Sequence, residues 1–246
     1  MGATICAAVR EVDDLELVAA VDPFRAGETV EGTDLVIAAD ASVLLAAGAQ
    51  VAIDFTVLDA ARENIRWCAA HDVHIVVGTT GFSTDDLDEY AELFTHSAAN
   101  GLIAANFAVG AVLMMRFAAL AAPWFETAEI IELHHDRKSD APSGTAMATA
   151  RRMTAASKEW AADPTKTVVS PGARGGLVDD AIRVHSVRMR GMIASQEVIL
   201  GTTGQSLTIR HDTFDRSSFM PGVLLGARRV AAFPGLTVGL DALLDG

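Results

Sequence analysis

The first half of this chain alternates short apolar runs with stretches of helical spacing. The runs have the length of buried strands and lie at Leu15–Val21, Val51–Phe55, His74–Val77 and Gly101–Ala104. The helical stretches comprise Ile5, Val9 and Val12, then Ala60–Ala70, Thr84–His96 and Val109–Ala122. Short strands that alternate with helices are typical of βαβ units with a parallel sheet. We therefore predict an α/β fold with a doubly wound parallel nucleotide-binding sheet, and only a loop and a short helix in residues 23–50.

After about residue 125 the strand-like runs follow one another without helices between them. We expect strands at Ala128–His134, Val184–Arg190, Gln196–Leu200 and Ser206–Arg210, a helix over Gly144–Lys158 and a long loop over Ala161–Asp180. Grouped strands of this kind form antiparallel or mixed sheets, which can leave one face open. The sequence thus predicts a second α+β domain with an open mixed sheet, followed by a closing helix within Ser217–Phe233.

The charge of the chain restricts its partners. The net charge is −13, which argues against a broad nucleic-acid or anionic-membrane surface. No apolar run reaches the ~20 residues of a membrane span and no signal peptide is recognisable, so we expect a cytoplasmic protein. Cys6 and Cys68 are too few for a disulfide framework or a multi-cysteine metal site. A small anionic ligand would need a local cationic pocket.

Such a pocket is predicted in the segment Glu132–Ala146. Four potential cations fall within five residues at the end of the predicted strand, namely His134, His135, Arg137 and Lys138. Ser143 fits the N-cap of the next helix, and Gly144 would let a ligand approach the N–H groups of its first turn. A carboxylate held by these N–H groups and by Lys138 is a reasonable ligand, and histidine is a natural proton donor near neutral pH.

The two adjacent histidines are not expected to bind a metal ion. Neighbouring residues of a strand point to opposite faces, so His134 and His135 are not expected to chelate one ion unless the strand ends there, and no metal site is predicted. The ordinary interpretation of a single histidine is a structural side chain. Two histidines, a rare lysine and a helix start within so short a segment favour a functional site instead.

Three short segments of the first half are candidates for nucleotide contacts. Asp22 ends an apolar run and lies about 20 positions after Gly2, the separation between the glycines and the ribose-binding acid of a dinucleotide fingerprint. The other candidates follow predicted strands at their carboxyl ends, where open α/β sheets bind ligands, and comprise Gly78, Thr79 and Thr80, then Ala104, Ala105, Asn106 and Phe107. The plainer alternatives are a strand-end aspartate and two tight turns.

The beginning of the chain departs from this pattern. A doubly wound domain normally opens with a buried strand and a glycine-rich turn, whereas this sequence starts inside the first helix. We interpret Gly2 as the last glycine of a turn whose earlier part is absent, and expect a mis-called start codon or a truncated gene. On this hypothesis the chain as written would be poorly soluble, because an absent central strand leaves apolar helix faces uncovered, or inactive, because the N–H groups that cradle a pyrophosphate are missing.

The motifs, taken in order along the chain, resemble those of the 4-hydroxy-tetrahydrodipicolinate reductases, also called dihydrodipicolinate reductases, of the actinobacterial type. The resemblance runs from Gly2 to near the C-terminus and depends most on the specific run Glu132–Ala146. It also covers the segments Leu15–Asp22, Ile53–Thr56, Val77–Phe82, Ala105–Phe107, Gln196–Val198, Leu207–Asp212 and Asp215–Arg216.

This resemblance implies a role for each candidate residue. On the substrate side, His134 would be the catalytic acid, His135 a substrate contact, Lys138 a second proton donor or carboxylate ligand, and Gly144 and Thr145 the ligands of the other carboxylate. On the cofactor side, Gly78, Thr79 and Thr80 would line the nicotinamide site with Ala104, Ala105, Asn106 and Phe107, and Asp22 would contact the adenosine ribose. Closure about Asn106 and Phe107 would bring the two sides together.

The resemblance also implies the partners and the domain organisation. The cofactor would be NADH or NADPH, the substrate a small dicarboxylate of lysine and diaminopimelate biosynthesis, and the assembly a homotetramer formed through the second sheet. Residues 1–107 with 217–246 would form the dinucleotide-binding domain, and residues 108–216 the substrate-binding and tetramerisation domain. Two alternatives stay open: another two-domain nicotinamide oxidoreductase acting on a sugar or amino acid, and a catalytically impaired homologue that acts as a binding subunit because the glycine loop is absent.

Overall fold

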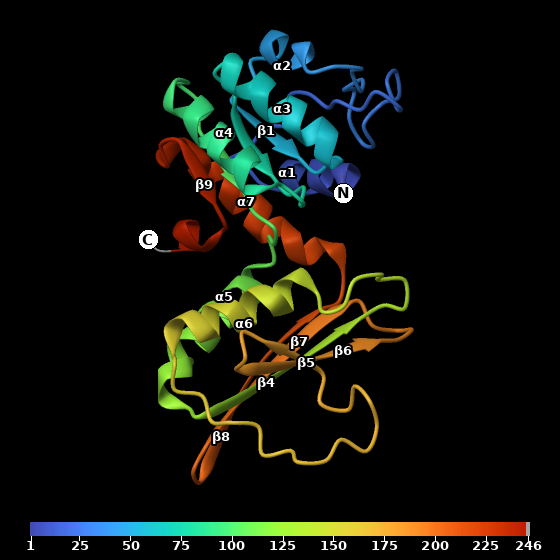
Figure 1. The fold of residues 1–246 in the computed structure, drawn as a ribbon. Coiled ribbons are helices and arrows are strands. Elements are labelled where there is room, and N and C mark those ends of the chain that lie inside the picture. Colours follow the sequence, from blue (N-terminus) through green and yellow to red (C-terminus); the bar gives the residue numbers. More distant parts are fainter. Residues whose placement is uncertain (245–246) are drawn as a thin grey trace. The chain divides into compact units, whose positions relative to one another are not determined.

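A computed structural model describes residues 1–244 of the chain (Figure 1). The chain forms two compact units, the first built from Met1–Val109 with the segment that begins at Arg216, the second from Gly110–Asp215. Residues 245 and 246, at which the expected dinucleotide-binding domain ends, lie outside the described residues. No helix within the described chain is both long and apolar enough to cross a membrane.

The second unit contains a mixed sheet in the order β5-β6-β4-β7-β8. Its elements are α5 (Val109–Ala121), β4 (Thr127–His134), α6 (Gly144–Ala156), β5 (Gly176–Val178), β6 (Ile182–Arg188), β7 (Ala194–Thr202) and β8 (Gln205–Thr213). Strand β4 pairs in parallel with β6 and antiparallel with β7. Helices α5 and α6 lie on one face of the sheet (Figure 1), and α6 packs on β4, β5 and β6. The predicted mixed sheet is confirmed.

Two details of this unit differ from the prediction. The long loop ends earlier than expected, because Gly176–Val178 pairs with β6 as an edge strand. This strand is too short to show a pattern in the sequence. Helix α6 ends at Ala156 rather than at Lys158, because Ser157 already has extended backbone angles.

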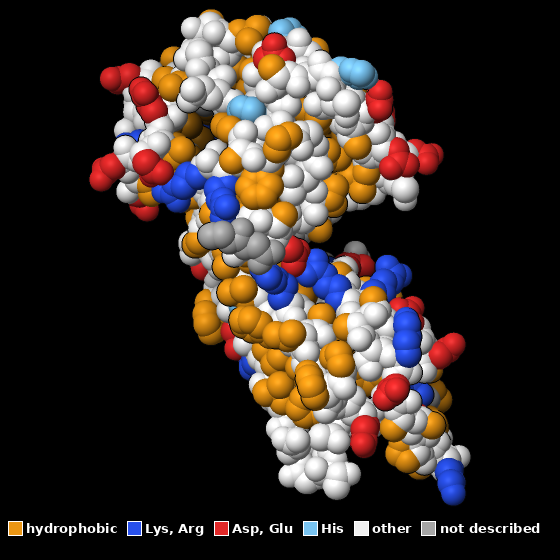
Figure 2. Space-filling view, turned by 90° about the vertical axis from the view of Figure 1, so that its left-hand side faces the viewer, with side chains coloured by type: hydrophobic (Ala, Val, Ile, Leu, Met, Phe, Trp, Pro, Cys, Tyr) orange, Lys and Arg blue, Asp and Glu red, His pale blue; other side chains and the backbone are white. Residues whose placement is uncertain are grey.

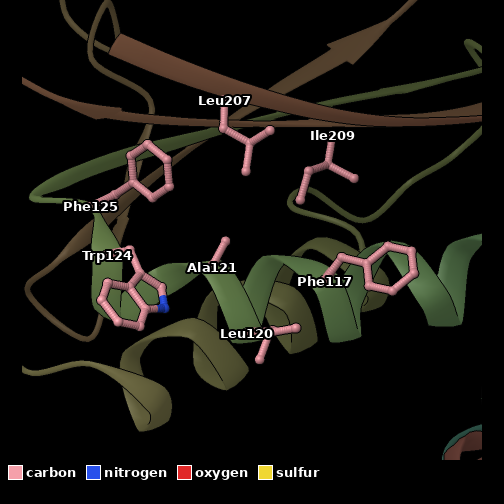
Figure 3. Close-up of a pocket in the computed structure, with 7 residues that line it drawn as sticks. All are labelled: Phe117, Leu120, Ala121, Trp124, Phe125, Leu207 and Ile209. Carbon is pink, nitrogen blue, oxygen red and sulfur yellow. The ribbon is translucent and has the colours of Figure 1, made fainter. Parts of the chain in front are cut away.

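The second unit also carries an exposed apolar hollow. Hydrophobic side chains gather on one face of this unit (Figure 2). Leu207 and Ile209 of β8 point toward the end of α5 and line the hollow (Figure 3). Phe117, Leu120 and Trp124 complete it and are 52%, 73% and 78% exposed. Exposed apolar surface that gathers in one place is typical of a binding or subunit interface.

The first unit contains a sheet in the order β1-β2-β3-β9, in which each pair of strands is parallel. Its elements are α1 (Gly2–Arg10), α2 (Ser42–Ala46), β1 (Val51–Asp54), α3 (Leu58–Ala70), β2 (His74–Val77), α4 (Thr84–Thr95), β3 (Gly101–Ile103), α7 (Met220–Arg229) and β9 (Leu236–Val238). Helices α3 and α4 cover one face, and α7 with α1 covers the other (Figure 1). Helix α7 approaches closely at Gly226, where an added Cβ would lie 3.1 Å from Val76. The predicted parallel sheet is confirmed.

One strand prediction in the first unit is wrong, and one strand was not predicted. The run Leu15–Val21 forms no ladder, and only Val21 makes a single bridge, with Ala38. A strand needs a continuous hydrogen-bonded neighbour, and here the bonds to Ala38 come from one position on each side of Val21. Strand β9 was not predicted, because three residues after a Pro-Gly pair carry too little periodicity. The expected loop and short helix in residues 23–50 are confirmed by α2.

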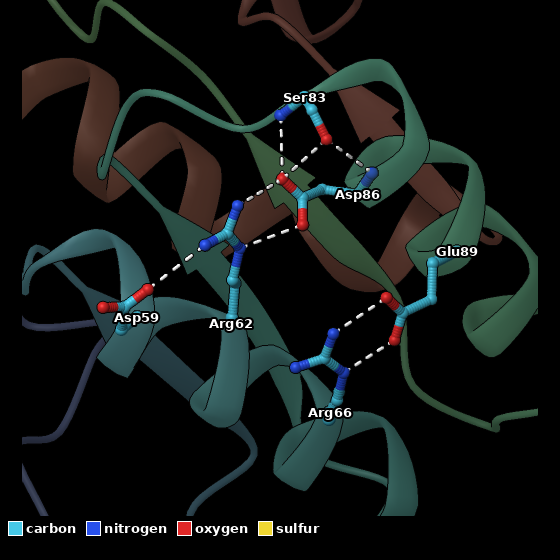
Figure 4. A network of polar contacts seen from close by, with 6 residues as sticks. All are labelled: Asp59, Arg62, Arg66, Ser83, Asp86 and Glu89. Atoms are coloured by element: carbon cyan, nitrogen blue, oxygen red, sulfur yellow. Dashed lines mark hydrogen bonds and ion pairs between the residues drawn. The ribbon is translucent and has the colours of Figure 1, made fainter.

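Charged side chains fasten α3 to α4 (Figure 4). Arg62 donates hydrogen bonds of 2.9 and 2.8 Å to Asp86, and Arg66 donates bonds of 2.6 and 2.8 Å to Glu89. Asp86 also forms a capping box with Ser83 at the start of α4. The hydrogen bonds from Arg62 hold the pKa of Asp86 below its usual range. These ion pairs hold α3, which precedes β2, against α4, which follows the turn after β2.

Candidate active site

The carboxyl end of β4 brings a carboxylate and a histidine to one face of the sheet. Alternate residues of a strand point to the same side, so Glu132 and His134 both lie on the buried face over which α6 packs. Nδ1 of His134 and Oε2 of Glu132 are 2.5 Å apart. A carboxylate only accepts hydrogen bonds, so the imidazole ring carries a proton on Nδ1. The side chain of Glu132 is fully buried, while that of His134 keeps 16% of its surface exposed.

Several further donors hold the buried carboxylate. Arg188 donates one bond of 2.8 Å to each oxygen of Glu132, and the backbone N–H of Ser143 donates to Oε1 at 3.2 Å. Burial alone would raise the pKa of Glu132, but hydrogen bonds from Arg188, Ser186 and His134 outweigh burial and lower it. Glu132 is therefore ionised at neutral pH, inside a paired and hydrogen-bonded site.

The pKa of His134 is lowered, chiefly because burial disfavours the charged ring. The positive charges of Lys138 and Arg188 lower it further, whereas Glu132 acts in the opposite direction. In the free protein at neutral pH the ring is neutral, with its proton on Nδ1 and a lone pair on Nε2. A dianion bound beside the ring would favour the imidazolium, which is the form of His134 that can donate a proton.

The loop after β4 holds the other two predicted substrate contacts. The backbone N–H of Lys138 donates to the carbonyl of His135, and the Nζ of Lys138 lies 2.8 Å from Asp140. Nδ1 of His135 accepts from the backbone N–H of Arg137 at 3.2 Å. Within residues 1–244, no group of three or more His, Cys, Asp or Glu residues is placed to hold a metal ion.

The first turn of α6 is joined to this cluster. Ser143 is the N-cap, and its hydroxyl accepts from the N–H of Ala146 at 3.2 Å. The backbone of Ser143 donates to Glu132, so the helix start and His134 share one carboxylate. Gly144 is exposed, and an added Cβ there would meet no atom within 4 Å. Together with Thr145 it presents a turn that an anion can approach.

In the first unit, a second buried carboxylate organises the predicted cofactor residues. Asp54 ends β1 and accepts hydrogen bonds from the hydroxyls of Thr56 and Thr79 and from the amide of Asn64. Thr79 is buried, whereas the next residue, Thr80, is exposed. Gly78 has no room for a side chain, because an added Cβ would lie 2.1 Å from the ring of Phe55.

The neighbouring strand supplies the second predicted segment. The N–H of Ala104 donates to the carbonyl of Val77, so the two segments lie at the same edge of the sheet. Ala105 is exposed, and the side chain of Asn106 accepts from the N–H of Ala108. The ring of Phe107 is buried and lies 5.4 Å from that of Phe55, centroid to centroid.

Asp22 lies outside the four-stranded sheet, next to the single bridge between Val21 and Ala38. It opens a tight turn in which its carbonyl accepts from the N–H of Arg25 and its Oδ1 accepts from the N–H of Phe24. Arg25 is bonded to Glu28 through two donors, at 2.9 and 2.6 Å. The structure thus brings the predicted residues together in three groups, one in the second unit and two in the first.

Sequence reasoning missed the roles of Glu132 and Arg188. Glu132 precedes His134 by two positions on the predicted strand, and period-two alternation would have placed both on one face. Arg188 carries no such signal, because it reaches Glu132 through the register of β4 with β6. That register depends on strand pairing between distant parts of the chain.

Family comparisons extend the geometric result. A profile described as dihydrodipicolinate reductase, N-terminus, matches residues 1–107, and one described as dihydrodipicolinate reductase, C-terminus, matches residues 110–244. The chain belongs to the dihydrodipicolinate reductase family. Members of this family use a nicotinamide cofactor.

Relatives within the dihydrodipicolinate reductase family cover nearly the whole chain. A 4-hydroxy-tetrahydrodipicolinate reductase from Nocardia farcinica is 51% identical over 100% of this chain and 94% of its own length. One from Cutibacterium acnes is 49% identical, with 99% and 94% covered. A dipicolinate-bound dihydrodipicolinate reductase from Paenisporosarcina sp. TG-14 has a TM-score of 0.86 at 34% identity, with 97% and 93% covered. An amine dehydrogenase from Mycobacterium smegmatis, at 14% identity and TM-score 0.66 over 98% of this chain and 93% of its own, shares the fold alone.

Proposed function

We propose that this chain is an NAD(P)H-dependent reductase that converts 4-hydroxy-tetrahydrodipicolinate to tetrahydrodipicolinate in lysine and diaminopimelate biosynthesis. The observation that carries the proposal is the shared carboxylate of Glu132, which holds a proton donor, His134, against a helix start suited to a carboxylate. The names of the relatives that match this chain over its length point to the same reaction.

The substrate is a cyclic imine with two carboxylates, and the second unit offers separate cationic or N–H groups for them. Gly144 and Thr145 at the start of α6 bind one carboxylate through backbone N–H groups and the helix dipole. Lys138, and His135 beside it, bind the other. Breaking the ion pair between Lys138 and Asp140 costs little free energy, because the side chain of Asp140 is 57% exposed.

His134 supplies the proton of the reaction. The 4-hydroxyl first leaves as water together with a proton from the neighbouring ring carbon, which creates a C=C bond conjugated with the imine. When hydride then adds to C4, electron density moves through this conjugated system to the ring nitrogen, which must be protonated. Nδ1 of His134 is engaged by Glu132, so Nε2 is the nitrogen that donates. The dianionic substrate favours the imidazolium that this step requires.

The first unit holds the cofactor. A reduced nicotinamide, when bound, supplies the hydride. Gly78, Thr79 and Thr80 after β2 and Ala104, Ala105, Asn106 and Phe107 after β3 fit such a ring, because they present backbone at the carboxyl ends of adjacent parallel strands. Phe107 contributes through its backbone, since its ring is buried against Phe55.

Asp22 decides between the two nicotinamide cofactors. Its free oxygen would accept from the ribose hydroxyls of NADH and repel the 2′-phosphate of NADPH. Arg25, at the end of the same turn, would attract that phosphate once it leaves Glu28. We therefore expect the chain to use both cofactors and to prefer NADH.

Assembly and location complete the proposal. The second unit, residues 108–216, would bind substrate and form a homotetramer, and residues 1–107 with 217–246 would bind the dinucleotide. Exposed Phe117, Leu120 and Trp124 favour a face that is covered in an assembly. Cys6 and Cys68 are free thiols, as suits a cytoplasmic enzyme.

The test is steady-state kinetics with the purified chain, with oxidation of NADH or NADPH as the readout. His134→Gln should lower kcat by about 100- to 10,000-fold, the usual contribution of general acid catalysis, with little change in KM. Lys138→Ala should damage both kcat and KM, because it removes a contact that binds the substrate carboxylate. Full turnover by His134→Gln would refute the assignment of the acid.

A further inference from the structure

One carboxylate joins the two functional parts of the second unit. Oε2 of Glu132 accepts from Nδ1 of His134 and from Arg188, while Oε1 accepts from Arg188 and from the N–H of Ser143. Ser143 caps α6. His134 is therefore hydrogen-bonded to one oxygen of the buried Glu132 carboxylate, and the start of α6 is hydrogen-bonded to the other oxygen.

We propose that Glu132 is the positioning residue of this site, which sets the tautomer of His134 and holds its ring in register with the first turn of α6. For its kinetic consequences this proposal rests on the proposed function. The proposal also states which ring nitrogen of His134 carries the proton, and this can be tested in the protein without substrate.

The partners of Glu132 can be matched as hydrogen-bond donors and acceptors. Arg188 and the N–H of Ser143 only donate, so both oxygens of Glu132 must accept. The hydroxyl of Ser186 is a further donor to this carboxylate. His134 can carry its proton on either ring nitrogen, and it places the proton on Nδ1 toward Glu132, which leaves Nε2 for a bound molecule. A glutamine at position 132 would carry an NH2 group in place of one carboxylate oxygen. On that side, one of the present donors would face another donor. With its oxygen kept on Arg188 and Ser143, that NH2 would face Nδ1 of His134 and move the ring proton to Nε2.

Charge acts in the same direction as hydrogen bonding. The groups that face His134 are Glu132 on its own strand, Lys138 in the following loop and Arg188 on β6. Without the charge of Glu132, two cations would face the ring and lower its pKa further. His134 would then lose its proton at a lower pH, so the alkaline limb of the kcat/KM profile would move to lower pH.

The experiment compares three variants with the unmodified chain. Glu132→Gln removes the charge, Glu132→Asp keeps it on a shorter side chain, and Glu129→Gln is the matched control on the other face of β4, where Glu129 binds Arg174 and His185. Histidine tautomers are read by 15N NMR without ligand, and kcat and kcat/KM are measured across pH. The unmodified chain and Glu129→Gln should show the Nδ1–H tautomer of His134.

Glu132→Gln should show the Nε2–H tautomer, a kcat about 100-fold lower, and an alkaline limb moved to lower pH. Glu132→Asp should lie between the two and restore part of the rate. The proposal is overturned if Glu132→Gln keeps the Nδ1–H tautomer and the rate of Glu129→Gln. If Glu132→Gln does not fold, an unaltered kcat in Glu132→Asp, whose shorter side chain should no longer hold the ring in register, overturns it equally. No turnover by the unmodified chain would instead refute the proposed function, while the tautomer of His134 would still test the positioning.

Discussion

Strand β4 carries two clusters of the same chemistry on its two faces, and each consists of a glutamate bonded to an arginine and a histidine. The inner cluster comprises Glu132, Arg188 and His134, and the outer cluster comprises Glu129, Arg174 and His185. The inner carboxylate is fully buried, whereas the outer one is 36% exposed. The inner cluster reaches the start of α6, and the outer one reaches the loop that carries Asp163.

Residue types alone do not make a functional site. Burial removes water from the inner cluster, so each hydrogen bond there is stronger and each unpaired group is more costly. The outer cluster is partly screened by solvent and fastens a loop to the sheet. Only the inner histidine lies beside a helix start that an anion can approach, and only there does the shared carboxylate link two functional parts.

The largest expected effect is on stability and follows from burial. Arg188→Ala would leave the buried carboxylate of Glu132 without its main partner and should lower the free energy of unfolding by about 3 kcal/mol. Arg174→Ala, the matched change in the outer cluster, should cost much less because solvent reaches Glu129. Urea unfolding of both variants measures the difference, and equal losses would contradict the ranking by burial.

The pH dependence of stability is the next expected effect. The pKa of His134 is lowered by burial from its ordinary 6.5, so the unfolded chain binds this proton more readily than the folded one. The contribution of His134 is therefore complete above pH 6.5 and is lost as the pH falls toward the folded pKa. In urea unfolding across this range, His134→Gln should flatten the loss of stability, and Glu129→Gln should leave it as it is. A slope unaffected by His134→Gln would contradict this account.

The smallest expected effect concerns a third pair, at the surface of the first unit. Arg25 and Glu28 are each about half exposed, so their attraction is weak and readily exchanged for another partner. Glu28→Gln should free Arg25 and raise the affinity for NADPH by about 2- to 5-fold, with NADH unaffected. Titration calorimetry with both cofactors checks this result. An unchanged preference would show that Arg25 does not reach the 2′-phosphate.

The sequence predicted the parts of the molecule that depend on local patterns. Periodicity placed β4 and α6, and the capping pattern placed Ser143, because strands and helix starts leave signals within a few residues. Arg188 and β9 escaped prediction, since their roles depend on pairing between distant segments. Leu15–Val21 has the composition of a strand but finds only a single bridge. Burial, which separates the inner from the outer cluster, is a property of the folded chain and not of the motif.

Glu132 and His134 act as one unit, and a double-mutant cycle on kcat measures their coupling. Glu132→Gln, His134→Gln and the combined variant are measured with reduced nicotinamide cofactor and 4-hydroxy-tetrahydrodipicolinate. If Glu132 acts only through His134, the combined variant should be no slower than His134→Gln alone. Losses that multiply in the combined variant would contradict the claim and give Glu132 a separate role.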